Sequence, residues 1–292
     1  MDIVKMEPNQ YNISKEKIAE YLNQIKDLNI IPPVLIQVMA LPDDNELSFK
    51  ELSNRVQTDQ ILVARIIKIA NSPFYNRGIE ITSLQNAIAR LGFRLIRSMI
   101  VVAMNDSIFA HGNYRKFREE VWQHSIASAI YGSKLVEQFL GKQEADKGII
   151  GGLLQDIGKV ILNMIDRKKY VEVLREFIET KRDIRLIEIE KFQVDHLSIG
   201  YAASRLWKLP EFVCKIIADR HLPIEKKSAL GIILSATDIL VRKAGFGLYT
   251  EQHQNELLEC QEALKYDLNS LNVSEIQNYI KDHELYKSVW YM

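Results

Sequence analysis

Apolar residues recur three or four positions apart along nearly the whole chain, which is the spacing of one face of an α-helix. No segment alternates apolar and polar residues with a clear period of two, as a half-buried strand would. Helix-start signals agree with this pattern. Ser48 with Glu51 forms a capping-box signature, and Thr58 or Asp59, and then Thr82, precede further apolar runs. The pattern therefore predicts an all-α protein.

The expected helices fall into two groups that separate near residues 111–116, so we predict two packed helical subdomains and a more polar helical cap. The predicted bounds are 1–112 for the first subdomain, 113–245 for the second and 246–292 for the cap. Helices are expected in the first subdomain over 15–28, after 31–35 to about 41, over 49–57, from 58 or 59 to 71, from 82 to 92 and over 93–111. In the second subdomain they are expected around 121–130 and over 146–165, 168–180, 184–191, 196–207, 210–220 and 228–243.

The segment 148–165 is apolar on almost every side of a helix, which predicts burial on most faces. It is long enough to cross a membrane, but it contains Gln155, Asp156 and Lys159. We therefore predict a core helix and no membrane span.

Composition narrows the class of protein. The chain is 47% hydrophobic, and its 38 Lys and Arg residues balance 38 Asp and Glu residues, so no overall field attracts it to nucleic acid or anionic membranes. The first residues lack the apolar core of a signal peptide. The two cysteines, Cys214 and Cys260, are too few and too far apart for a disulfide framework or a thiolate zinc site. These features predict a cytoplasmic protein.

Isolated polar residues stand in three of the apolar helices of the second subdomain. His124 lies among small residues, the pair Gln155-Asp156 interrupts the segment 148–165, and Asp238 lies in the helix 228–243. A buried carboxylate is costly unless something pairs with it. Helical bundles build metal sites from such side chains on separate helices, and a mixed nitrogen and oxygen set suits Mn, Fe or Mg.

Several motifs then occur in a recognisable order. In the second half they are VWQHSIASA (121–129), GLLQDIGKVIL (152–162), VDHLSIGYAASRLWKLP (194–210) and the RH of DRHLP (219–223). In the first half they are IPPVLIQVM, ELSNRVQTDQILVARIIKIANSPFY and SLQNAIARLGF. Over roughly residues 30–240 this combination resembles the HDOD family, a regulatory branch of the HD superfamily of metal-dependent phosphohydrolases.

The resemblance implies a pocket built around the superfamily's metal ligands, which are a His, a His-Asp doublet and a distal Asp. His124, the pair Gln155-Asp156 and Asp238 correspond to these ligands. In addition, His196 matches a further ligand position, and Lys159 matches a residue that approaches substrate phosphate in active relatives. His196 and His221 are expected near the rim. The residues expected to converge are His124, Gln155, Asp156, Lys159, His196, His221 and Asp238.

Departures from the family pattern imply that the site is degenerate. Gln155 stands where the doublet has its His, and Arg220-His221 stands where the HD-GYP phosphodiesterases have a His-His doublet. The Gly-Tyr-Pro signature of those relatives is missing. The resemblance thus implies a non-catalytic regulatory module of bacterial signal transduction with protein partners. We expect no catalytic residue and no cofactor, or at most a weakly bound divalent metal on His124, Asp156 and Asp238, and Gln155→His is expected to increase metal affinity.

Each candidate residue also has a purely structural interpretation. Taken alone, His124 is better interpreted as a hydrogen-bonded core histidine, and Asp156 is compatible with a local pair to Lys159. Asp238 could serve only to bond a helix end near His124, and His221 could be a histidine favoured by the dipole at a helix C-terminus.

Two other functions are compatible with the sequence. One is a metal-dependent phosphohydrolase acting on a nucleotide or a cyclic dinucleotide. The other is DNA binding through residues 47–100, which carry eight Lys and Arg residues against three Asp and Glu residues. The would-be recognition helix at 61–70 is apolar on most of its circumference, however, and such a helix cannot lie in a major groove. Packing of two core helices is therefore the favoured interpretation of that stretch.

Overall fold

The computed structural model describes residues 13–25, 60–71, 80–93, 117–220, 222–283 and 286–287, together with positions 52–53, 56, 78, 96–97 and 100. Within these residues the chain is helical and contains no strand, which confirms the all-α prediction.

The helices of the first half are α1 (Lys15–Ile25), α4 (Gln60–Ala70) and α5 (Leu84–Leu91). The second half opens with a π-helical turn, η2 (Arg118–Gln123), which runs directly into α8. It continues with α8 (His124–Leu140), α9 (Ala145–Leu154), α10 (Ile157–Ile165), α11 (Arg167–Thr180), α12 (Ile184–Phe192), α13 (His196–Leu206), α14 (Glu211–Asp219) and α15 (Ala229–Lys243). The chain then forms α16 (Glu251–Leu264) and α17 (Val273–Asp282), with short 3-10 turns at Lys142–Glu144, Ile224–Lys226 and Leu268–Ser270.

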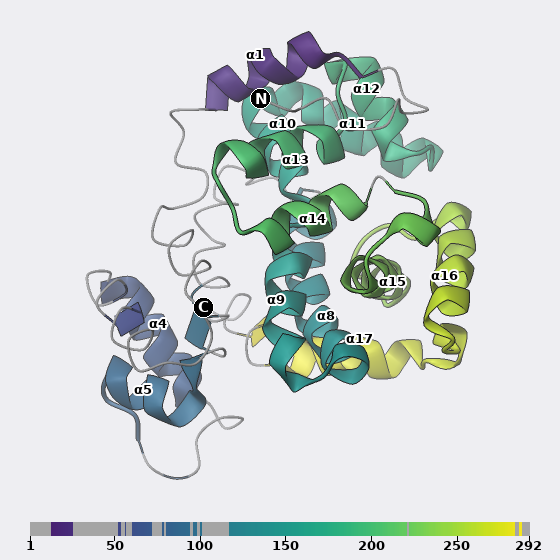
Figure 1. Cartoon of the computed structure of the whole chain (residues 1–292). Helices are drawn as coiled ribbons and strands as arrows, with labels where there is room; N and C mark the ends of the chain where they lie inside the picture. The colour runs from purple at the N-terminus through teal and green to yellow at the C-terminus, as the bar shows by residue number, and fades with distance from the viewer. Residues whose placement is uncertain are drawn as a thin grey trace.

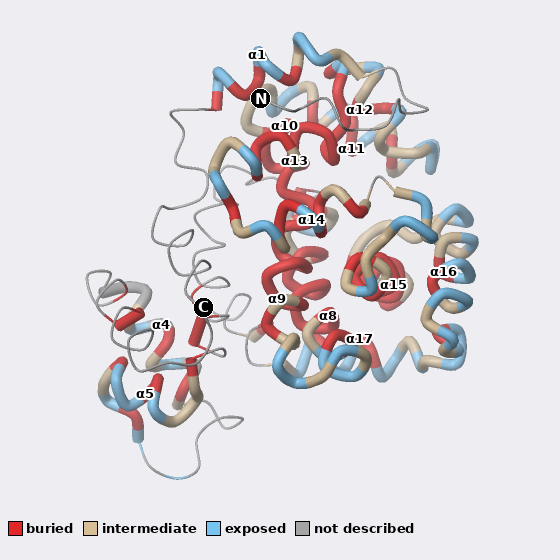
Figure 2. Tube along the Cα trace, in the orientation of Figure 1, coloured by how far each residue is buried: buried red, intermediate tan, exposed pale blue. Residues whose placement is uncertain are grey.

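The core of the second half is the close pair α8 and α9, with α15 packed beside them (Figure 1). All three are buried along most of their length, while α16 is exposed on its outer side (Figure 2). Glycines permit the close approach of α8 and α9. A β-carbon at Gly152 would lie 2.5 Å from the backbone nitrogen of Ala129, and one at Gly148 would lie 2.5 Å from the carbonyl oxygen of Gly132. Real β-carbons do not approach backbone so closely, so these positions require glycine for this packing.

The apolar segment that the sequence predicted as one helix is broken at Gln155-Asp156. The helix α9 ends at Leu154, Asp156 adopts φ −106° and ψ 19°, and α10 starts at Ile157. The prediction of a continuous helix over 146–165 was therefore wrong. The apolar pattern runs through the break because both helices are buried, and an apolar pattern alone does not reveal where a helix is interrupted.

The same segment was predicted to be a core helix and not a membrane span, and its burial can be checked in the part of the chain that the structure describes. Residues 142–165 form the one helical stretch there that is long and apolar enough to cross a membrane, and 89% of its apolar window is buried inside the protein. That degree of burial is typical of a core element of a soluble domain.

The helix α10 packs against α13, and α1 lies next to both of them (Figure 1). The Tyr21 hydroxyl donates to the Phe192 carbonyl oxygen at 3.2 Å, and the Ser14 backbone nitrogen donates to the Gln193 carbonyl oxygen at 2.9 Å. The N-terminal helix thus packs on the second half of the chain, and a buried ion pair between Arg97 and Asp146 also joins the two halves. The domain bounds predicted from the sequence stay a prediction.

Local signals place most helix starts within one or two residues. The N-cap of α5 is Ser83, whose Oγ accepts from the Asn86 backbone nitrogen at 3.1 Å, and not Thr82 as predicted. The reason is geometric, because Ser83 has the extended backbone of an N-cap and the correct spacing to the third residue of the helix. The predicted caps at Ser48 and Thr58 lie outside the described residues.

The described part of residues 47–100 agrees with core packing. The helices α4 and α5 contact each other, and Ile66 and Ala70 of α4 are buried, as are Ala87 and Ile88 of α5. A helix with a buried apolar face in such a pair presents little of its surface to a DNA groove.

Candidate functional site

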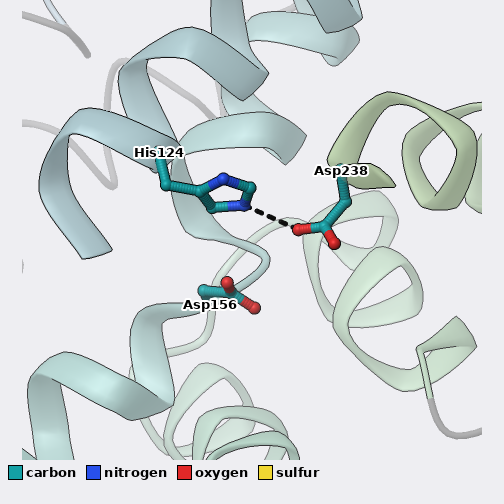
Figure 3. A group of neighbouring side chains, drawn as sticks. All are labelled: His124, Asp156 and Asp238. Carbon is teal, nitrogen blue, oxygen red and sulfur yellow. Dashed lines mark hydrogen bonds and ion pairs between the residues drawn. The ribbon is translucent and has the colours of Figure 1, made fainter. Parts of the chain in front are cut away.

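Three of the residues singled out in the sequence meet in the interior. His124 is the first residue of α8, Asp156 lies in the turn before α10, and Asp238 lies in the middle of α15. Their donor atoms all lie within 4.8 Å of one another, and all three side chains are buried. Figure 3 shows the three side chains directed toward a common point from separate elements. One imidazole and two carboxylates thus form a group that could hold a metal ion.

The position of His124 is fixed at both ring nitrogens. Its Nδ1 donates to the Phe246 carbonyl oxygen at 2.7 Å, and its Nε2 lies 2.7 Å from Oδ1 of Asp238. A histidine that binds metal commonly donates its other ring N–H to a carbonyl oxygen in this way. The π-helical turn η2 directly precedes His124, and such turns often occur at functional sites.

Asp156 is paired within its own turn. The Lys159 ammonium donates to Oδ2 of Asp156 at 2.6 Å, whereas Oδ1 is buried without a hydrogen-bond partner among the described residues. Burial raises the pKa of the Asp156 carboxyl, but the charges of Lys159 and His196 lower that pKa more, so it falls well below its usual value. The neighbouring Gln155 is also buried, and neither its amide oxygen nor its amide nitrogen has a hydrogen-bond partner in the described part of the chain.

Asp238 lies between two arginines. Arg242 Nε donates to Oδ2 of Asp238 at 3.1 Å, and Arg220 Nη2 lies 3.5 Å from the same oxygen. Burial raises the pKa of the Asp238 carboxyl, but the charges of Arg242, Arg220 and His124 outweigh it and hold that pKa well below its usual value. Arg242 was not among the residues proposed from the sequence. The signal available there was its spacing of four residues from Asp238 on one helix.

His196 is oriented by a buried carboxylate that the sequence analysis also missed. Glu188 Oε2 accepts from the backbone nitrogen of His196 at 2.8 Å and from its Nδ1 at 2.6 Å. The Tyr170 hydroxyl donates to the other oxygen of Glu188 at 3.2 Å. With Nδ1 held in this way, Nε2 faces Asp156, whose Oδ1 lies 3.8 Å away.

A cavity of about 130 Å³ opens beside this group. Of the residues expected at the site, those that line it are Lys159, His196 and Asp238. Arg220 and Arg242 line it as well, and α16 closes one side with residues that include His253. His124, Gln155 and Asp156 lie outside its lining, and His221 lies outside the described residues.

His253 is expected to make the stability of the folded protein depend on pH. Burial and the charge of Arg242 lower the pKa of its imidazole to about 3, and Nδ1 accepts from the Thr250 backbone nitrogen at 3.0 Å in a capping box. The unfolded chain takes up a proton near pH 6.5, whereas the folded protein resists protonation down to about pH 3. The stabilisation is therefore complete above pH 6.5 and is lost as the pH falls.

We expect His253→Gln to flatten this pH dependence. Glutamine at the same position keeps the capping acceptor but does not titrate. As the pH falls from 7 to about 4, the free energy of unfolding should fall more steeply for the wild type than for His253→Gln. The two slopes should differ by up to about 1.4 kcal/mol per pH unit. Urea unfolding of both proteins at a series of pH values measures the difference, and parallel curves would contradict the assignment.

The candidate ligand atoms favour binding of a divalent metal ion, whereas the surrounding charges oppose it. One imidazole nitrogen and two carboxylates within 4.8 Å suit a single divalent ion. However, Lys159, Arg220 and Arg242 all lie within 4.0 Å of one of the carboxylates, so the two carboxylates of this group are already paired with three positively charged side chains. A divalent ion would add two more positive charges to a buried cluster. The residues present therefore do not fit a resident divalent metal.

Comparisons with known proteins place the fold. A family model described as the HDOD domain matches residues 28–223, so Asp238 and Arg242 lie beyond the matched part. An HDOD domain protein of unknown function from Geobacter sulfurreducens has a TM-score of 0.72 at 22% identity, with 91% of this chain and 97% of that one covered. No protein among the curated sequences matches.

Two further crystal structures share the fold. A candidate phosphohydrolase from Shewanella amazonensis SB2B has a TM-score of 0.67 at 18% identity, with 92% of this chain and 96% of that one covered. A candidate signal transduction protein from Marinobacter aquaeolei VT8 has a TM-score of 0.63 at 17% identity, and the match covers 94% of this chain and 62% of that longer one.

Proposed function

Because the chain belongs to the HDOD domain family, we propose that it is a non-catalytic regulatory module of bacterial signal transduction that acts through protein partners. We place it in the cytoplasm, since both cysteines are unpaired and buried. In this proposal the residues of the former HD site hold the helices together beside the cavity, but turn over no substrate.

The observation that carries the proposal is the pairing of both carboxylates with buried cations. Asp156 is bound by Lys159, and Asp238 is bound by Arg242 with Arg220 next to it. Hydrolysis by an HD site needs a metal that holds a water molecule and lowers its pKa, and that needs carboxylates free to bind the ion. In this chain the lysine that would approach phosphate is itself engaged.

The competing function is a metal-dependent phosphohydrolase. It is favoured by the convergence of His124, Asp156 and Asp238 and by the shared fold with a candidate phosphohydrolase. The two functions make opposite predictions about metal content and turnover, so one experiment separates them.

We expect protein purified without chelator to contain substoichiometric Mn, Fe and Zn by elemental analysis. We also expect no turnover of bis(p-nitrophenyl) phosphate or of a cyclic dinucleotide in the presence of added Mn²⁺. The matched control is Asp156→Asn, which keeps the shape of the side chain and removes its charge. Turnover by the wild type that needs Mn²⁺ and disappears in Asp156→Asn would establish the phosphohydrolase instead.

A further inference from the structure

One side chain, Arg242, contacts all three members of the candidate metal group. Its Nη2 lies 3.2 Å from Nε2 of His124, 3.5 Å from Oδ1 of Asp238 and 3.8 Å from Oδ2 of Asp156. A single nitrogen atom thus lies close to one donor atom from each of the three residues. Lys159 and Arg220 lie at the edge of the group instead, where Lys159 forms its close ion pair with Asp156 and Arg220 forms its close ion pair with Asp238.

The loop after α15 closes over this guanidinium. The Phe246 carbonyl oxygen accepts from His124, and Gly247 follows with φ +121°, a backbone conformation that favours glycine. A β-carbon at Gly247 would lie 3.1 Å from Nη1 of Arg242 and 3.3 Å from Nδ1 of His124. The loop and the three candidate ligand residues therefore surround the guanidinium on the sides away from the cavity, and the Arg242 side chain is 5% exposed.

The positive charge of Arg242 balances the buried carboxylates beside it. Burial lowers the pKa of the Arg242 guanidinium, but the charges of Asp238 and Asp156 raise that pKa more, so the group stays protonated. Two buried carboxylates in a common space repel each other and need a cation between them. A divalent metal meets that need in an active site of this composition, and here an arginine from the same chain is placed to meet it.

We propose that Arg242 is the resident cation of this site and occupies the place of a divalent metal. The proposal rests on the non-catalytic function proposed above and adds its cause. The guanidinium links α8, the turn before α10 and α15, because it lies against the nitrogen and oxygen atoms that would otherwise bind metal. Metal and Arg242 therefore exclude each other, and Gln155→His alone raises metal affinity little while Arg242 remains.

The test compares four proteins: wild type, Gln155→His, Arg242→Met and the double variant of both changes. Methionine keeps the length of the side chain and removes its charge. We expect Mn²⁺ affinity measured by calorimetry to rise about 100-fold or more in Arg242→Met, because a unit positive charge within 4 Å of the ion is removed. The double variant should bind more tightly still, and Mn²⁺ should raise the melting temperature of both proteins that lack Arg242 but not that of the wild type.

Arg242→Lys is the matched control, since it keeps a positive charge and should bind Mn²⁺ as weakly as the wild type. Tight Mn²⁺ binding by the wild type, or equal weak binding by folded wild type and Arg242→Met, would overturn the proposal. If Arg242→Met does not fold, the variant carrying both Asp238→Asn and Arg242→Met decides. Recovery of its melting temperature supports the proposal, because the unpaired carboxylate charge is then gone, and no recovery overturns it.

The outcome for the proposed function is separate. Mn²⁺ binding by Arg242→Met without phosphodiester turnover by the wild type supports both proposals. Turnover by the wild type with Arg242 in place rejects the non-catalytic function, whatever the binding data show.

Discussion

Replacing Gly158 by alanine is expected to reduce the free energy of unfolding by at least about 3 kcal/mol. Gly158 lies in the first turn of α10, where the backbone of α13 crosses it. A β-carbon there would overlap the carbonyl oxygen of His196, and its next contacts are further backbone atoms of the same residue. Alanine is intrinsically better in a helix by about 1 kcal/mol, but a clash with backbone cannot be relieved by a side-chain rotation, so the clash dominates.

The control is Gly200→Ala, at the same helix crossing but on α13. Its β-carbon would lie 3.2 Å from the Gly158 backbone nitrogen, a contact that a small shift relieves. Urea unfolding should show a much smaller loss for Gly200→Ala than for Gly158→Ala. Equal stability of Gly158→Ala and the wild type would show that α10 and α13 do not cross this closely.

Glu188→Ala is expected to cost about 3 to 5 kcal/mol, because it leaves buried donors without an acceptor. The carboxylate accepts from the backbone nitrogen and Nδ1 of His196 and from the hydroxyl of Tyr170, and it is fully buried. Each buried donor that loses its partner costs about 1 to 3 kcal/mol, so the sum exceeds the gain from removing one buried charge.

The same substitution should also change the state of His196, which a loss of packing alone would not do. Nitrogen NMR of the ring should show that Nδ1 no longer carries a hydrogen-bonded proton in Glu188→Ala. Glu188→Gln keeps an acceptor oxygen and the volume of the side chain, so it should lose less stability and retain the ring orientation. An unchanged His196 spectrum in Glu188→Ala would rule out the assigned role of Glu188 in orienting the ring.

The helical class of this protein follows from its sequence, because the spacing of apolar residues is a local property of each segment. The same holds for the short helices α11 and α12, whose predicted ranges differ from the observed ones by a single residue at an end. The break at Gln155-Asp156 could not be seen in that way. Next to the break, Gly158 meets the backbone at His196, a contact between residues that the hydrophobic pattern does not relate.

For the candidate site, too, the sequence determines one part and the tertiary structure decides the other. His124, Asp156 and Asp238 could be selected from the sequence because an isolated polar group in an apolar helix needs a partner, and this requirement is independent of the fold. Which partner each carboxylate receives is decided by distance in three dimensions. The spacing of Asp238 and Arg242 permits a pair on one helix, but the contacts of Arg242 with His124 and Asp156 exist only once α8, the turn before α10 and α15 have packed together. The sequence alone therefore determines that buried charge must be balanced at this place, and the tertiary structure decides that an arginine of the chain supplies the balancing charge.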